Sequence, residues 1–145
     1  MIGTYPSEIV RVTSVLLSPF MMLFGLYVIA HGHYGPGGGF AGGVALAVGV
    51  ITLRLVTDET DVDRRFPPAL GLIAGAVGML LFLAVGTLPL LLGGAFLDYG
   101  AVDVPGMAAS RVRYMGILVV EIAVGLAVFG ALLLLFDSLT RRARA

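Results

Sequence analysis

The chain has 145 residues, of which 59% are hydrophobic and only 12% are charged, and its formal net charge is zero. A mean hydropathy of +1.03 lies well above that of a water-soluble domain, so the sequence predicts a protein whose solvent is lipid. Because cysteine is absent, disulfides, thiolate metal sites and thiol nucleophiles are excluded, and no basic stripe with interleaved aromatics indicates a nucleic-acid partner. We predict no enzymatic activity, no catalytic residue and no cofactor.

A helix needs roughly 20 apolar residues to cross the hydrocarbon core of a bilayer, and four stretches meet this length. They predict an all-α integral membrane fold, a single domain over 1–145 with four transmembrane helices at about residues 9–30, 40–56, 69–92 and 114–136.

Arginine placement predicts that the N- and C-termini are both cytoplasmic, because cytoplasmic loops retain an excess of Lys and Arg. Only Arg111 and Arg113 fall on one side of the predicted bundle. The other side holds Arg11, Arg54, Arg64, Arg65, Arg141, Arg142 and Arg144.

Two histidines, His31 and His33, follow the first apolar stretch at its outward end. Histidine exchanges protons near physiological pH, so both are candidates for an outer proton path, and a capping or loop-stabilising role is an equal alternative. Two histidines without a third ligand are a weak metal signal, so we predict no metal site.

The segment from His31 to Phe40 reads HGHYGPGGGF and contains five glycines. It lacks the Lys-Ser/Thr pair of a P-loop and no strand precedes it, so it does not indicate nucleotide binding. Glycine permits left-handed or closely approached backbone and Pro36 stiffens the turn, which predicts a tight hairpin between the first two helices.

Small residues recur at helical spacing in the second and third stretches, at Gly39, Gly43 and Ala47 and at Gly71, Gly75 and Gly78. Such faces let helices approach closely, so we predict packing among the four helices, with a docking face for other subunits as the alternative.

Glu121 is a carboxylate among aliphatic residues about seven positions inside the fourth stretch. Such a group costs a few kcal/mol unless it is paired, protonated or hydrated, and Gly125 on the same face predicts a contact with a helix or a wet cavity. The functional interpretation is a proton or cation relay, and the alternative is a carboxyl that only fixes packing. By helical rise Arg54 lies at another depth, so we expect it to snorkel to the cytoplasmic surface or to pair with an acid of the following loop.

The run HGHYGPGGGFAGGVALA resembles the signature of the MrpB/MnhB subunit of Mrp-type monovalent cation/proton antiporters, which is roughly G-H-x-x-P-G-G-G-F-x-G-G. The matching positions are His33, Pro36, Gly37, Gly38, Gly39, Phe40, Gly42 and Gly43. The family commonly has aspartate in a segment like FDLGVY where this chain reads VEIAVG, so Glu121 keeps the acid while the aromatic end is absent.

The resemblance implies a multi-pass subunit of a complex in the bacterial inner (plasma) membrane, with partner subunits of the A, C, D, E, F and G types. Such complexes exchange Na⁺ or K⁺ for H⁺ and are related to the membrane arm of respiratory complex I. The chain has no lysine and one deeply placed carboxylate. We therefore expect it to support assembly, with Glu121 and the glycine turn lining an ion or proton path.

Three alternatives remain open at this point. The first is a homologous subunit of a membrane-bound hydrogenase or another complex I-related respiratory complex. The second, less favoured, is a small drug/proton exporter, because such exporters carry their membrane glutamate in the first helix. The third is a pure scaffold or assembly factor.

Overall fold

The computed structural model describes residues 7–34, 37–102 and 104–142, with only the backbone of His33, Arg141 and Arg142. Four of its helices are long and apolar enough to cross a membrane, which confirms the predicted number. The elements in chain order are α1 (Glu8–His31), η1 (Gly32–Tyr34), α2 (Gly38–Val56), α3 (Glu59–Arg65), α4 (Ala69–Leu91), η2 (Tyr99–Ala101) and α5 (Ala109–Arg142).

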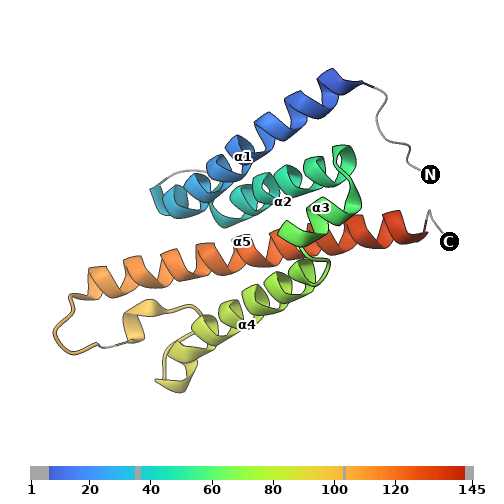
Figure 1. The fold of residues 1–145 in the computed structure, drawn as a ribbon. Coiled ribbons are helices and arrows are strands. Elements are labelled where there is room, and N and C mark those ends of the chain that lie inside the picture. The colour runs from blue at the N-terminus through green and yellow to red at the C-terminus, as the bar shows by residue number, and fades with distance from the viewer. Residues whose placement is uncertain (1–6, 35–36, 103, 143–145) are drawn as a thin grey trace.

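The four long helices lie side by side in the order α1, α2, α5, α4, so that the last helix of the chain separates the second from the fourth (Figure 1). Helix α5 packs against both α2 and α4, while the main neighbour of α1 is α2. The beginning of α1, the short α3 and the end of α5 lie at one end of the bundle (Figure 1). The glycine turn and the loop before α5 lie toward the other end.

Glycine allows α1 and α2 to touch through their backbones. A β-carbon added at Gly25 would lie 2.8 Å from the carbonyl oxygen of Gly42, and one added at Gly42 would lie 2.6 Å from the carbonyl oxygen of Gly25. Farther along the pair, the buried hydroxyl of Ser18 donates a 2.6 Å hydrogen bond to the carbonyl of Gly49. This hairpin therefore rests on close van der Waals packing and one interhelical hydrogen bond, as is typical of membrane helices.

Close approach at glycine residues also joins α4 to α5. A β-carbon at Gly78 would lie 2.6 Å from the carbonyl oxygen of Ala123, and one at Gly71 would lie 3.1 Å from the Cβ of Leu133. Ala123 and Leu133 are fully buried. The prediction that the small-residue faces pack within this chain is confirmed for these glycines.

Two boundaries differ from the prediction. Helix α5 has 34 residues and begins at Ala109, not near residue 114, and it continues to Arg142. Hydropathy detects only the apolar middle of such a helix, whereas polar end turns can remain helical outside the lipid. The loop after α2 also contains α3, which has Glu59 and Asp61 in its first turn and Arg64 and Arg65 in its last, the arrangement that the helix dipole favours.

The loop between α4 and α5 folds back onto these helices. The ring of Phe96 packs edge-on against Phe82 and fills the space beside Gly86. The ring of Tyr99 covers Gly116 of α5. These contacts hold the loop against the end of α4 and the beginning of α5.

Candidate functional site

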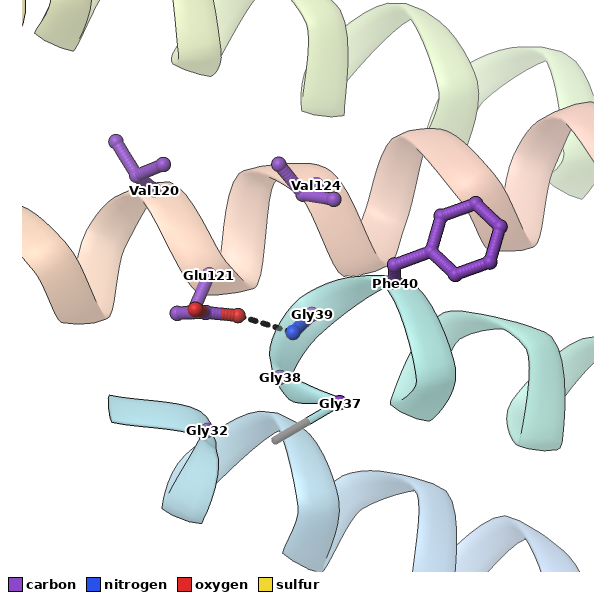
Figure 2. Close-up of a pocket in the computed structure, with 8 residues that line it drawn as sticks. All are labelled: Gly32, Gly37, Gly38, Gly39, Phe40, Val120, Glu121 and Val124. Carbon is purple, nitrogen blue, oxygen red and sulfur yellow. Dashed lines mark hydrogen bonds between the residues drawn. The ribbon is translucent and has the colours of Figure 1, made fainter. Parts of the chain in front are cut away.

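Glu121 of α5 lies against the first turn of α2. Its carboxylate oxygen Oε2 accepts a hydrogen bond from the backbone N–H of Gly39, a residue 82 positions away in the chain (Figure 2). The first four N–H groups of a helix have no acceptor within the helix. The N-cap residue of α2, Gly37, supplies no side-chain bond. Glu121 therefore caps α2 from another helix.

This contact supplies the compensation that a carboxylate needs among apolar helices. The N-terminus of a helix carries about half of a positive elementary charge, and an N–H bond to a carboxylate is stronger than a bond between neutral groups. The pairing thus places the carboxyl group of Glu121 at the positive end of α2, and its hydrogen-bond partner is a main-chain N–H group.

Glycine makes this approach possible. A β-carbon at Gly38 would lie 2.7 Å from Cδ of Glu121, and one at Gly39 would lie 2.9 Å from the Glu121 main-chain carbonyl carbon. One at Gly32 would lie 3.1 Å from Oε2. Gly37 and Gly38 also have φ values of +114° and +42°, a region that side chains rarely adopt. Residues with side chains at these places would push α5 away or distort the turn.

A pocket of about 310 Å³ opens at this contact (Figure 2). Apart from Glu121, its lining consists of glycines and apolar side chains: Gly32, Gly37, Gly38, Gly39, Phe40, Val120 and Val124. Phe40 is 64% exposed, so the pocket faces outward from the isolated chain. The site combines one half-buried carboxylate with close-packed backbone and apolar walls.

The structure brings together only part of the predicted set. Gly37, Gly38, Gly39 and Phe40 gather at Glu121, which makes the glycine turn and the membrane acid one site. Gly42 and Gly43, the end of the motif, instead pack against α1 and against Gly125 and Val128 of α5.

Of the two histidines predicted for the proton path, the structure describes the side chain of His31 only. His31 is exposed at the end of α1, where its ring stacks on Tyr27 at a centroid distance of 5.1 Å and tilts against Tyr34 at 5.2 Å. It is absent from the lining of the Glu121 pocket. The side chain of His33 and the whole of Pro36 lie outside the described residues.

Arg54 corrects the prediction of its partner. Its side chain is only 8% exposed, and its Nη1 donates to Oδ1 of Asp137, on α5, rather than to an acid of the following loop. Its Nη2 donates a 3.1 Å hydrogen bond to the carbonyl of Phe66. The prediction erred because the last helix was expected to end at residue 136, which left Asp137 in the tail. As predicted, Arg54 does not meet Glu121.

Asp137 is the residue that sequence reasoning missed, although its spacing carried a signal. It follows Glu121 by 16 positions, and Arg54 follows Gly39 by 15. In two parallel helices, spacings that differ by only one residue place both pairs at nearly matching levels. Polar contacts therefore mark both ends of the α2–α5 interface.

Metal binding has no support in the part of the chain that is described. Those residues contain no group of three or more His, Cys, Asp or Glu side chains that could hold a metal ion.

Four apolar helices joined through glycine faces, with a capped carboxylate between two of them, define a multi-pass membrane protein. Residues 9–134 match the family model described as a domain related to the MnhB subunit of Na⁺/H⁺ antiporters. The chain belongs to this family and is a multi-pass protein of the bacterial membrane.

Individual relatives agree with this assignment. The chain is 33% identical over 91 residues to the B-type subunit of the Na⁺/H⁺ antiporter of Bacillus subtilis, a match that covers 63% of this chain and 63% of that protein, less than two thirds of its length. It is 27% identical over 120 residues to a Staphylococcus epidermidis protein named "Putative antiporter subunit mnhB2", with 83% of this chain and 84% of that protein covered.

Proposed function

We propose that this chain is a small membrane subunit of a multisubunit Na⁺/H⁺ antiporter, in which it supports assembly and lines part of the ion or proton path. Family membership and the names of the relatives support the first statement. The second rests on one observation, the Glu121 carboxylate that is capped by Gly39 and borders an open pocket. The transported ions would be Na⁺ and H⁺, and the partners would be the other subunits of the antiporter.

The chemistry of the pocket fits this role. Ionisable groups within membrane helices mark ion or proton pathways by default, because their cost is tolerated only for a reason. The hydrogen bond from Gly39 occupies Oε2, and a carboxylate has capacity for further bonds at its other oxygen. That oxygen can take up a proton or contact a cation without dismantling the cap.

We also propose that both termini face the cytoplasm. The start of α1, α3 and the end of α5 share one end of the bundle (Figure 1), and these segments hold Arg11, Arg64 and Arg65. Lys and Arg near membrane helices remain on the cytoplasmic side.

The test is Na⁺/H⁺ exchange in vesicles from antiporter-deficient cells that carry the whole complex. Glu121→Gln keeps a carbonyl that can accept the Gly39 N–H but removes the ionisable group. We expect exchange to fall at least about tenfold, equivalent to about 1.4 kcal/mol in the limiting step, while a native gel shows an intact complex. Asp61→Asn, which removes an exposed acid on α3, is the matched control and should leave exchange unchanged.

Two outcomes would contradict the ion-path role. If complex and exchange disappear together in Glu121→Gln, the carboxylate only fixes packing. If exchange continues at the normal rate in the assembled variant, Glu121 lies off the path.

A further inference from the structure

We propose that the mouth of the Glu121 pocket is a docking site for a membrane helix of another subunit, and that this helix brings a basic side chain to the carboxylate. The inference rests on the proposed function, because it assumes that the chain works within a complex. The described residues bring no basic side chain to the pocket lining, and the docking helix would supply one.

Helices α2 and α5 offer no polar route onward from Glu121. Between Phe40 and Leu53 the only polar side chain of α2 is Thr52, and α5 has none between Ile122 and Phe136. Gly43 packs against Gly125, and Ala47, Val50 and Leu133 are almost completely buried. About 22 Å of close-packed apolar interface therefore separates Glu121 from the Arg54–Asp137 pair.

The pocket at Glu121 is open in the isolated chain. Its wall is glycine and apolar, and Phe40 at its edge is 64% exposed. The hydrogen bond from Gly39 uses Oε2 of Glu121, and a carboxylate can form further bonds through its other oxygen. A carboxylate among apolar membrane helices is costly unless it is paired, so a protein surface that supplies donors is the favourable cover.

The first turns of α5 extend beyond the end of α2. Helix α5 runs past the end of the α1–α2 hairpin (Figure 1), since Gly39 lies level with Glu121 and α5 begins twelve positions earlier, at Ala109. This leaves about 18 Å of α5 beyond α2. Ile117 lies on the Glu121 face of that segment by helical spacing and is 40% exposed. This segment of α5 is long enough to contact about three turns of a partner helix.

The carboxyl group of Glu121 favours a docking helix that carries a basic side chain. Among the described residues that line the pocket, Glu121 is the one charged residue. Lys or Arg on the docking helix would pair with the second oxygen of Glu121 and complete its coordination. Charge complementarity thus favours a basic helix over a bare lipid chain or a second copy of this apolar surface.

The absence of cysteine from the chain permits a clean test in the assembled complex. Ile117→Cys, one turn from Glu121, is labelled with a thiol-reactive benzophenone and irradiated, and adducts are mapped by mass spectrometry. Leu135→Cys, on the same helix and 60% exposed, is the matched control. We expect the Ile117 probe, unlike the control, to attach to another subunit within one helical turn of Lys or Arg.

A double-mutant cycle then tests the charge pairing. Replacement of that basic residue by Met should reduce exchange as Glu121→Gln does, and the double variant should lose no more than about twofold beyond either single one. The inference is overturned if Ile117 yields only lipid adducts, a dimer of this chain, or a peptide without a nearby basic residue, or if the two losses multiply.

These results separate the inference from the proposed function. Lipid adducts at Ile117 together with loss of exchange in an assembled Glu121→Gln complex would remove the docking site and leave the ion-path role standing. An adduct at Ile117 with a helix that has a nearby Lys or Arg, together with normal exchange in Glu121→Gln, would support the docking site and remove the ion-path role.

Discussion

At Glu121, a side chain and a main chain from distant parts of the sequence form one contact. The carboxylate reaches the Gly39 N–H because no β-carbon stands between α5 and the first turn of α2. The geometry depends on side-chain length as well as charge. A shorter acid would keep the negative charge but would leave the helix end uncapped.

Glu121→Asp tests this dependence on length. Aspartate is shorter by one methylene group, so it should fail to reach Gly39 and the complex should lose about 1–2 kcal/mol of stability, the usual cost of a lost N-cap. Glu121→Gln, which keeps the acceptor, should lose less. The melting temperature of the purified complex measures both, and equal stability of the Asp variant and the wild type would refute the cap.

The sequence predicted the members of this site but only part of its geometry. Glu121 stands out because a carboxylate among aliphatic residues is costly, and the glycines stand out because they cluster. The contact between Oε2 of Glu121 and Gly39 joins residues that are 82 positions apart in the chain. It depends on how α5 is shifted along its axis relative to α2, and hydropathy does not encode this shift. Gly32, close to the carboxylate, was also not singled out.

Among the helices, α2 and α5 run parallel, with a polar contact at each end and apolar packing between. At the end where α2 stops, Arg54 is 8% exposed and Asp137 is 18% exposed, so the pair is largely removed from solvent. Breaking a buried pair leaves one uncompensated charge, whereas replacing both members by apolar residues is often nearly neutral.

Arg54→Met should therefore destabilise the complex by about 3–5 kcal/mol, and Arg54→Met with Asp137→Leu should recover most of that loss. Thermal unfolding of the purified complex provides the comparison. A double variant that is as unstable as the sum of the two single ones would show that Arg54 and Asp137 act independently.

The contact between α4 and α5 contains its own matched pair of glycines. A β-carbon at Gly130 would lie 2.5 Å from the carbonyl oxygen of Gly71 and 2.6 Å from Cα of Gly75, whereas one at Gly75 would find its nearest neighbour at 3.7 Å. Gly130→Ala should cost about 1–3 kcal/mol through overpacking. Gly75→Ala should be neutral or stabilising by up to about 1 kcal/mol. Equal effects in an unfolding assay would contradict this packing.

Helix existence was predictable because each apolar stretch is long and continuous, whereas helix ends were not. The polar residues at both ends of α5 belong to the helix, although nothing in their hydropathy separates them from a loop. Missing that extension also hid Asp137, so one error of boundary produced the wrong partner for Arg54.

In the whole molecule, α5 is the longest helix, and it packs against both α2 and α4. Its 34 residues span about 51 Å, against about 28 Å for the 19 residues of α2. The α1–α2 hairpin and α4 flank it on two sides (Figure 1), and the outer part of α5 is packed by η2 through Tyr99 and Gly116. The Glu121 face of α5 beyond α2 is the surface on which we propose that a partner helix docks.

The orientation of this assembly can be decided with two conservative single-cysteine variants. Thr60→Cys in α3 and Ser110→Cys in the first turn of α5 are exposed and lie at opposite ends of the bundle. If the arginine-rich end is cytoplasmic, a membrane-impermeant maleimide should label Ser110→Cys in intact spheroplasts and Thr60→Cys only in inverted vesicles. The opposite pattern would place the termini outside, and it would turn the Glu121 pocket toward the cytoplasmic supply of protons and Na⁺ instead of the external one.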